Sequence, residues 1–233
     1  MIFDAIAFDA DDTLWDNEYL YTQAKARFAG MFSDCCSQEA CLQRLEEIES
    51  HNVRYYGYGI KSFILSMIEA ALELSGGQAP AEVITSILAT ARQMLSADVL
   101  LIDGVGETLE ALAQRCPLML ITKGDPSEQR PKILHSGLSG YFRWVEVVHE
   151  KTPEVYRAIL ERCGLRPERF LMVGNSLRSD ILPVLAIGAR AVYIPYADTW
   201  SHELVDEDPV GEYTTLENLR LLPGYVEKLM QDS

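Results

Sequence analysis

The sequence predicts an α/β protein built on a doubly wound parallel sheet, with an all-helical segment inserted after the first strand. Two observations support this prediction. A short apolar run at residues 6–8 precedes a long stretch, residues 15–95, in which we expect helices and no strand. After Asp103-Gly104, short apolar runs alternate with helical segments, a pattern typical of parallel strands joined by crossover helices.

Five apolar runs have the length and composition of buried strands. They are residues 6–8, 118–121, 145–148, 170–173 and 191–194. Helices are expected between the later runs. One ends near Ser136-Gly137, one covers residues 153–163 with Gly164 as its stop, and one begins near Arg178.

The inserted segment has the periodicity of amphipathic helices. Residues 38–51 and 60–74 carry apolar side chains at helical spacing. Ser75-Gly76-Gly77 breaks the pattern, and Pro80 opens a further helix over residues 81–95. This succession predicts a compact helical bundle.

The chain is therefore expected to form two domains. Its 233 residues are enough for two hydrophobic cores. Because the first strand precedes the helical stretch and the others follow it, the sheet domain is discontinuous. We assign residues 1–15 and 99–233 to the sheet domain and residues 16–98 to the helical domain.

The charge balance limits the partners of the protein. The net charge is −15, which argues against nucleic acid and against an anionic membrane, because both would be repelled. A small phosphorylated metabolite remains compatible with this charge, since one bound cation and one lysine can reverse the local field.

The cysteines and the N-terminus indicate a cytoplasmic protein. The five cysteines include no C-x-x-C pair, so they form neither a disulfide framework nor a zinc-binding pattern, and reduced thiols are expected. The sequence starts with Met-Ile-Phe-Asp and lacks the basic and apolar segments of a signal peptide.

A cluster of carboxylates follows the first expected strand. Asp9, Asp11 and Asp12 come directly after the apolar run, with Thr13 next. Two carboxylates one residue apart can act as nucleophile and proton donor around one substrate atom. Their charge also favours a bound cation. The alternative is an acidic surface turn.

Three more polar clusters follow later strands. Thr122-Lys123-Gly124 offers a hydroxyl and free backbone N–H groups that suit phosphate oxygens. Lys151 precedes a helix, against the helix dipole, which an anionic partner would explain. Asn175 and Asp180 offer the hard oxygen ligands that Mg²⁺ prefers. An ordinary turn, a solvated lysine and a helix cap are the respective alternatives. Strand ends of a parallel sheet share one edge, so all four clusters are expected to converge.

Together these clusters form an ordered set of motifs. In chain order they read D-x-D-x-T, Thr, Lys and G-N-S-x-x-x-D. With the inserted helices, the set resembles the haloacid dehalogenase (HAD) hydrolase superfamily over essentially the whole chain, including a helical cap of the C1 type. The resemblance implies a Rossmann-like core. It also implies phosphate-ester hydrolysis, since members that cleave carbon–halogen bonds lack the carboxylate found here at Asp11.

The resemblance implies a catalytic role for each of four residues. Asp9 would attack phosphorus and form an aspartyl-phosphate. Asp11 would protonate the leaving alkoxide and then act as the base for water. Thr122 would bind the phosphoryl group, and Lys151 would neutralise the charge on the nucleophile and the phosphate.

Magnesium is the cofactor that the resemblance implies. Its ligands would be Asp9, the backbone carbonyl of Asp11 and Asn175. Asp180 would lie close by, either in the outer shell of the metal or oriented toward Lys151. Asn175 stands where the family often has aspartate, which removes one formal charge from the site but keeps an oxygen ligand.

One further departure from the family is Asp12, which stands where glycine is usual. Aspartate tolerates unusual backbone angles, so the turn can still form. Its role is left open.

Substrate contacts are expected from both domains. Thr122, Lys123, Gly124 and Lys151 would bind the phosphate. Tyr58 and Lys61, in a helical-domain segment rich in aromatic residues and glycine, would contact the leaving group; alternatively, the tyrosines pack the domain and the glycines form a turn.

The expected activity is a magnesium-dependent phosphatase acting on a small phosphorylated metabolite, as a monomer or homodimer. Two alternatives are a phosphomutase of similar fold and a catalytically silent binding protein on the same scaffold. A phosphonate-cleaving enzyme would need a cap lysine that forms a Schiff base; Lys25 and Lys61 are available, but neither has a specific signature.

Overall fold

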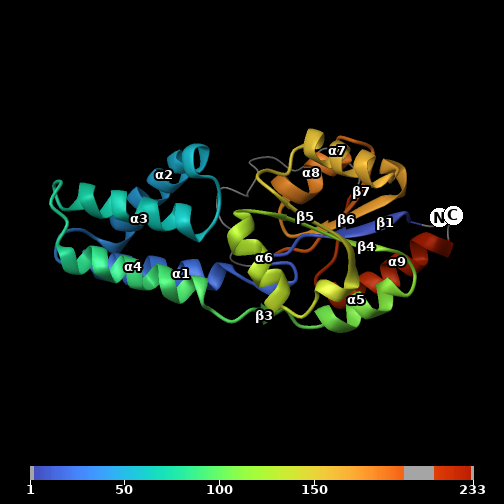
Figure 1. Cartoon of the computed structure of the whole chain (residues 1–233), viewed down its shortest axis with the longest axis horizontal. Helices are drawn as coiled ribbons and strands as arrows, with labels where there is room; N and C mark the ends of the chain where they lie inside the picture. Colours follow the sequence, from blue (N-terminus) through green and yellow to red (C-terminus); the bar gives the residue numbers. More distant parts are fainter. Residues whose placement is uncertain (1–2, 197–212, 232–233) are drawn as a thin grey trace. The chain divides into compact units, whose positions relative to one another are not determined.

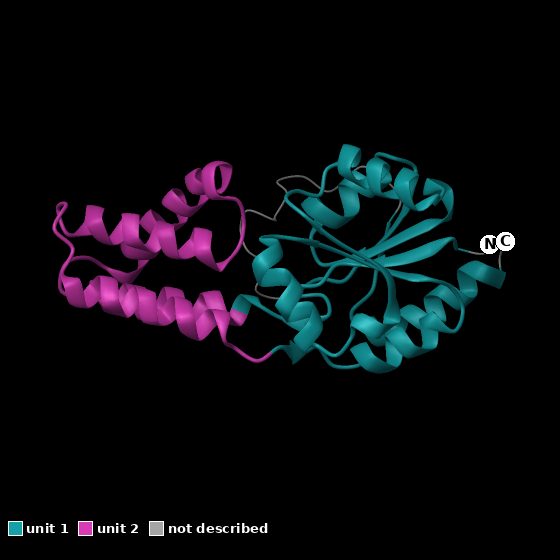
Figure 2. Cartoon of the chain, viewed as in Figure 1, with its two compact units in different colours: residues 1–18, 99–233 teal, residues 19–98 magenta. Residues whose placement is uncertain are grey.

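The computed structural model describes residues 3–196 and 213–231 (Figure 1). The chain divides into two compact units, which Figure 2 shows in different colours. Residues 1–18 and 99–233 form the sheet unit, and residues 19–98 form the helical unit. Residues 16–18 belong to the sheet unit because Trp15–Asp16 pairs as a short strand with Leu100–Leu101.

Among the described residues, six strands of the sheet unit form one parallel sheet with the order β5-β4-β1-β6-β7-β8. The strands are β1 (Ala5–Phe8), β4 (Leu118–Lys123), β5 (Phe142–Val148), β6 (Phe170–Gly174), β7 (Arg190–Tyr193) and β8 (Thr214–Thr215). The first strand in sequence thus lies between β4 and β6, where Phe8 is in register with both Leu120 and Val173. This order confirms the predicted doubly wound α/β class.

Alternate residues of β1 are buried in two different cores. Ile6 and Phe8 belong to a core that also contains side chains of the helices on one face of the sheet. Those helices are α5 (Val105–Ala113), α6 (Pro126–His135) and α9 (Leu222–Gln231). Ala5 and Ala7 face a second core, with α7 (Pro153–Cys163) and α8 (Leu182–Leu185). Both faces are covered because α5, α6 and α9 pack on one face and α7 and α8 pack on the other (Figure 1).

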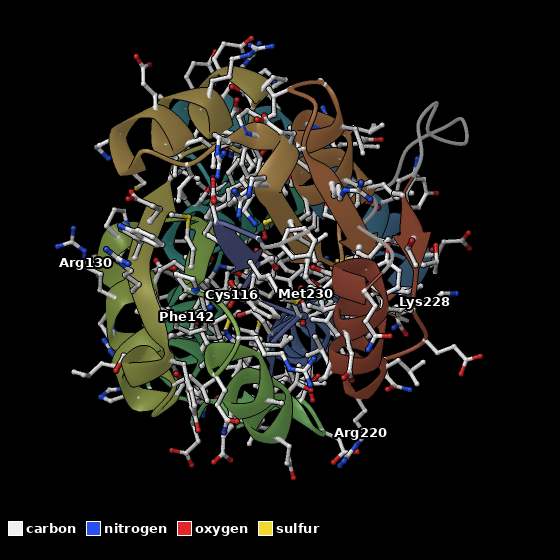
Figure 3. All side chains as sticks on the ribbon, turned by 90° about the vertical axis from the view of Figure 1, so that its right-hand side faces the viewer. Cys116, Arg130, Phe142, Arg220, Lys228 and Met230 are labelled. Atoms are coloured by element: carbon white, nitrogen blue, oxygen red, sulfur yellow. The ribbon has the colours of Figure 1, made fainter. Side chains whose placement is uncertain are left out.

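Figure 3 shows side chains that belong to the first of these cores. Figure 3 shows Cys116, Phe142 and Met230 directed into the packed interior, while Arg130, Arg220 and Lys228 extend outward. All five cysteines have free thiols, as the spacing predicted. No helix of the described ranges is both long enough and apolar enough to cross a membrane.

One expectation about strands is wrong. Within residues 15–95 no strand was expected, yet β2 (Trp15–Asp16) pairs antiparallel with β3 (Leu100–Leu101). Two-residue strands carry no periodic hydrophobic pattern, so pattern analysis does not detect them. The pair joins the two chain segments that connect the units.

The helical unit contains four helices in its described residues. They are α1 (Glu18–Gly30, which begins at the last residue of the sheet unit), α2 (Gln38–Tyr56), α3 (Ile60–Leu74) and α4 (Ala81–Leu95). Its core takes large apolar side chains from every helix, among them Phe28, Leu45, Met67 and Ile87. The bounds of α3 and α4 agree with the prediction. Helix α2, in contrast, continues five residues beyond His51 to Tyr56, and its C-cap is Gly57, whose φ is 72°.

A carboxyl group is buried inside this unit. Glu49 of α2 is 7 % exposed, and its Oε2 has no hydrogen-bond partner among the described residues. Burial raises the pKa of Glu49 to about 7; the charge of Lys25 opposes the shift and that of Glu46 adds to it. The ionised carboxylate therefore costs free energy in the folded state only.

We expect Glu49→Gln to change how stability depends on pH. The unfolded carboxyl ionises near 4.5 and the folded one near 7. As the pH rises from 4.5 through 7, the wild-type protein therefore loses stability, by up to about 3 kcal/mol. Below pH 4.5 both states are protonated and the penalty disappears. The glutamine variant lacks this loss, so its advantage should grow across that window.

Urea unfolding followed by circular dichroism at several pH values measures this difference. Glu39→Gln, at an exposed glutamate in the first turn of the same helix, is the matched control and should follow the wild-type pH profile. A difference between Glu49→Gln and wild type that stays constant from pH 4.5 to 8 would show that Glu49 does not titrate on unfolding.

Candidate active site

The side chains of Asp9, Lys151 and Asp180 meet at the carboxyl edge of the parallel sheet. Asp9 follows β1, Lys151 lies between β5 and α7, and Asp180 follows β6. The Lys151 Nζ donates hydrogen bonds to Asp9 Oδ1 and, at 2.6 Å, to Asp180 Oδ1. One ammonium group thus bridges two carboxylates, as expected for side chains at the carboxyl edge shared by the strands of one parallel sheet.

Lys151 is a fully enclosed cation. Its side chain is 1 % exposed. Burial disfavours its charge, but the two carboxylates outweigh that effect and raise its pKa above the ordinary range, so Lys151 stays protonated. This ion pair explains a lysine placed before the N-terminus of α7, where Thr152 caps the helix by accepting a hydrogen bond from the Val155 N–H at 3.3 Å.

Asp180 is held by its local backbone. Its Oδ2 accepts a hydrogen bond from the Ser176 N–H at 3.0 Å, while Oδ1 contacts Lys151. A Cβ atom at Gly174 would lie 2.2 Å from Asp180 Oδ2, so this packing requires glycine. Burial raises the pKa of Asp180 to about 7, against the effect of Lys151. With both oxygens engaged, the geometry favours the second of the two expected roles, orientation toward Lys151.

Thr13 connects Asp9 to Asn175. Its hydroxyl lies 3.1 Å from Asp9 Oδ2 and 3.1 Å from Asn175 Oδ1. A carboxylate oxygen and an amide oxygen therefore lie on either side of one hydroxyl. Both are hard donors of the kind that Mg²⁺ takes. The described residues contain no cluster of three or more His, Cys, Asp or Glu suited to a metal ion.

The Asp11 carboxylate has a separate set of partners. Its Oδ1 accepts hydrogen bonds from Trp15 Nε1 and Lys132 Nζ, both at 2.6 Å, and Oδ2 accepts one from Gln129 Nε2 at 2.8 Å. Burial opposes ionisation of Asp11, but the charge of Lys132 and the three donors outweigh it and lower the pKa. The sequence analysis missed these three partners. The i, i+3 spacing of Gln129 and Lys132 was a usable signal, because it places both on one helix face.

Asp12, whose role was open, connects the loop after β1 to helix α1. Its Oδ1 accepts hydrogen bonds from the backbone N–H groups of Asn17 and Glu18, at 2.8 and 2.9 Å. Its φ is 60°, in the left-handed region that aspartate tolerates better than most residues. Burial raises its pKa to about 7, although the two N–H groups favour the carboxylate. Glycine at this position would allow the turn but would not cap the helix.

The end of β4 and the loop after it differ in two respects from the expectation. Thr122 was expected to follow the strand, but β4 continues to Lys123 and Thr122 is a buried residue within it. The Gly124 N–H was expected to be free for phosphate, but it donates to the Val148 carbonyl at 3.0 Å. The parallel pairing of β4 with β5 continues one residue past the strand and uses this group. The Lys123 Nζ contacts Ser179 Oγ at 3.2 Å.

The remaining two candidates, Tyr58 and Lys61, belong to the helical unit. Tyr58 lies between α2 and α3, and Lys61 lies in the first turn of α3. Their contact with a substrate stays a prediction.

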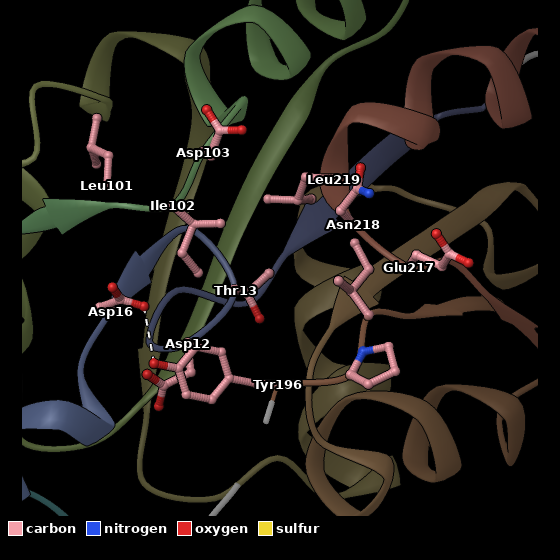
Figure 4. Close-up of a pocket in the computed structure, with 12 residues that line it drawn as sticks. Asp12, Thr13, Asp16, Leu101, Ile102, Asp103, Tyr196, Glu217, Asn218 and Leu219 are labelled. Atoms are coloured by element: carbon pink, nitrogen blue, oxygen red, sulfur yellow. Dashed lines mark hydrogen bonds between the residues drawn. The ribbon is translucent and has the colours of Figure 1, made fainter. Parts of the chain in front are cut away.

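A pocket of the sheet unit is lined in part by Asp12 and Thr13 of the loop after β1, but not by Asp9 or Asp11 (Figure 4). It is lined by Asp12, Thr13, Asp16, Leu101, Ile102, Asp103, Ile194, Pro195, Tyr196, Glu217, Asn218 and Leu219. Tyr196 donates to Asp16 Oδ1 at 3.0 Å. The volume of this pocket, about 260 Å³, is below the range of about 300–1,000 Å³ that is usual for small-molecule sites. Neither Asp9 nor Lys151 lines it, so it is not the site of the expected chemistry.

Comparison with curated proteins gives two informative relatives. The chain is 26 % identical over 235 residues to the 5-amino-6-(5-phospho-D-ribitylamino)uracil phosphatase of Escherichia coli, covering 92 % of this chain and 95 % of that protein. It is 33 % identical over 82 residues to the glyceraldehyde 3-phosphate phosphatase of Pyrococcus furiosus. That second match covers 33 % of this chain and 34 % of the relative.

The fold and the family are shown by two further comparisons. A crystal structure of a haloacid dehalogenase-like family hydrolase from Xanthomonas campestris is 39 % identical, with a TM-score of 0.88 over 99 % of this chain and 93 % of that one. The family model of haloacid dehalogenase-like hydrolases matches residues 3–188. The match contains β1, the helical unit and the strand ends that carry Asp9, Lys151 and Asp180. The chain therefore belongs to the haloacid dehalogenase-like hydrolase family.

Proposed function

We propose that this hydrolase is a magnesium-dependent phosphatase that cleaves a small phosphorylated metabolite through an aspartyl-phosphate at Asp9. The observation that carries the proposal is the buried Lys151 bridge between Asp9 and Asp180. A phosphate dianion and a carboxylate nucleophile repel each other, and a fixed ammonium group beside the nucleophile reduces this repulsion. The names of the relatives agree, since both reported curated proteins are phosphatases.

The proposed reaction has two steps, which use Asp9 and Asp11 of the loop after β1, called the catalytic loop from here on. A carboxylate oxygen of Asp9 forms a bond to phosphorus while the ester P–O bond breaks and its electron pair goes to the leaving oxygen. Asp11 enters this step protonated, with the proton that it took from water in the second step of the preceding turnover, and gives that proton to the leaving oxygen. In the second step the Asp11 carboxylate takes a proton from water as the water attacks phosphorus, which frees Asp9 and releases inorganic phosphate.

The groups around these carboxylates serve binding and orientation. Asp9, Asn175 and the Asp11 carbonyl would hold Mg²⁺, which when bound would neutralise charge on the phosphate oxygens. Thr13 holds Asp9 and Asn175 side by side. Asp180 keeps the Lys151 ammonium beside Asp9. Thr122, near the end of β4, would bind the phosphoryl group.

The helical unit is proposed to act as the cap domain and to select the leaving group. Its Tyr58 and Lys61 are the candidates for contacts beyond the phosphate, with Lys123 and Gly124 closer to it. The relatives carry out the same class of reaction on different substrates, a triose phosphate in one and a ribitylaminouracil phosphate in the other, by their names. A cytoplasmic location and a monomeric or homodimeric state remain predictions from the sequence.

Phosphate release from p-nitrophenyl phosphate and from a panel of phosphorylated sugars, nucleotides and acids tests this function. We expect hydrolysis with Mg²⁺, a loss of about 100-fold or more in EDTA because the repulsion is no longer offset, and recovery when Mg²⁺ is restored. Full activity in chelator would contradict the proposal. Phosphoryl transfer between sugar phosphates without release of phosphate would indicate a mutase, and inactivity on the whole panel would indicate a binding protein.

A further inference from the structure

The Asp11 carboxylate is oriented by two residues of helix α6, on a different element from the catalytic loop. Gln129 and Lys132 lie three positions apart on α6 and reach opposite oxygens of Asp11, at 2.8 and 2.6 Å. Lys132 is anchored in turn by Asn17 Oδ1 at 3.0 Å. The carboxylate is thus fixed from α6 as well as by Trp15 of its own loop.

Gln129 is fixed by its surroundings. The residue is 4 % exposed, and its Nε2 also donates to the Lys123 carbonyl at 3.2 Å. A Cβ atom at Gly124 would lie 3.0 Å from Gln129 Nε2, so the glycine leaves room for the amide beside the loop. The amide therefore links the end of β4, the strand that carries Thr122, to the Asp11 carboxylate.

The three hydrogen-bond donors are distributed unequally between the two carboxylate oxygens of Asp11. An ionised carboxylate offers about two acceptor positions on each oxygen. Trp15 and Lys132 both bind Oδ1, which occupies that atom, whereas Gln129 alone binds Oδ2. Among the contacts of the described residues, Oδ1 therefore has both of its acceptor positions occupied, whereas Oδ2 has one position that no donor occupies.

We propose that Gln129 and Lys132 are positioning residues that orient Asp11 so that Oδ2 exchanges the proton with the leaving group and then with water. This inference rests on the proposed phosphatase function. As the ester bond breaks, the Oδ2 proton moves to the leaving oxygen, and the carboxylate that forms is the state to which Lys132, Gln129 and Trp15 donate. The same carboxylate then accepts a proton from water.

The test compares leaving groups within one series of aryl phosphates. 4-Nitrophenolate leaves readily without a proton, whereas unsubstituted and 4-methoxy phenolates need one, so only the latter depend on the acid. We expect Lys132→Met and Gln129→Met to lower kcat for phenyl phosphate by about 10-fold or more, and for 4-nitrophenyl phosphate by less than about threefold. KM should change little. Asp11→Asn should give the steepest leaving-group dependence.

Two controls separate positioning from damage to the fold. Arg130→Met removes an exposed cation from the same helix and should leave the leaving-group dependence at the wild-type slope. Lys132→Arg keeps a donor and a positive charge, so its leaving-group dependence should be closer to that of the wild type than to that of Lys132→Met. Thermal unfolding of each variant shows whether it is folded.

The outcomes of this experiment are distinct. A wild-type enzyme that hydrolyses none of the aryl phosphates with Mg²⁺ contradicts the proposed function. The positioning role alone is overturned if the wild type is active but Lys132→Met and Gln129→Met lower kcat by the same factor for every aryl phosphate. It is likewise overturned if they lower kcat for none of them.

Discussion

Asp9→Asn is expected to abolish hydrolysis while leaving the protein folded. The amide has nearly the shape of the carboxylate but is a very poor nucleophile, so kcat should fall by about 10⁴-fold or more. The substitution leaves no unpaired buried charge, because Lys151 keeps its contact with Asp180 at 2.6 Å. The midpoint of thermal unfolding should therefore stay within about 3 °C of wild type, equivalent to about 1 kcal/mol. Steady-state kinetics and thermal unfolding of the same preparation measure both effects.

The matched control is the aspartate at the other end of the same strand. Asp4 precedes β1 and pairs with Arg166 at 2.8 Å and Arg169 at 3.2 Å, at the edge opposite the candidate site. Asp4→Asn removes an equal charge from the same strand and should retain wild-type kcat. If Asp9→Asn kept more than about a tenth of the wild-type kcat, Asp9 could not be the nucleophile.

Much of the fold follows from local patterns in the sequence. The bounds of α3, α4 and α7 could be predicted because a breaker bounds each helix on one side and each has an apolar face of helical period. The end of α2 could not be predicted. Asn52 is typical of a helix end because its amide competes with the backbone. Here the Asn52 Nδ2 bonds Ser66 Oγ at 3.2 Å and Glu69 Oε2 at 2.7 Å, both on α3, so the helix continues.

For the candidate site, the sequence predicts the strand ends but not the contacts between elements. Asp9, Lys151 and Asp180 are brought together by the parallel order of β1, β5 and β6, which the alternation of strands and helices implies. The contact of Lys132 with Asp11 depends instead on how α6 packs beside the catalytic loop. No local pattern encodes that packing, and the loss of the free Gly124 N–H to β5 is likewise a tertiary effect.

Lys151→Met is expected to affect stability as well as activity. The methionine fills a similar volume but leaves Asp9 and the fully buried Asp180 without their shared cation. Removing one partner of a buried ion pair destabilises proteins by about 3–5 kcal/mol. The charge that offsets phosphate repulsion is also lost, and kcat should fall by about 10²–10³-fold or more. Lys228→Met, an exposed lysine of α9, is the control and should change neither quantity.

The pH dependence of Lys151→Met separates charge repulsion from poor packing. The Asp180 pKa is 3.8 in the unfolded state and about 7 in the folded wild type, and losing the ammonium raises it further. A folded pKa above the unfolded one means that stability is lost as the pH rises. Asp180 is protonated below pH 7 in both folded proteins, so its contribution to the destabilisation by Lys151→Met should be small there and should grow as the pH rises above 7.

A second substitution makes the same distinction at a fixed pH. Lys151→Met combined with Asp180→Asn removes one of the two unpaired carboxylates, so it should recover a large part of the lost stability. It should recover none of the activity, because the nucleophile at Asp9 still lacks its cation. Urea unfolding and kcat of the single and double variants give the comparison. Equal instability of both variants at pH 5 and pH 8 would mean that Lys151 stabilises the protein by packing, and the ammonium bridge would then lose its place in the proposed reaction.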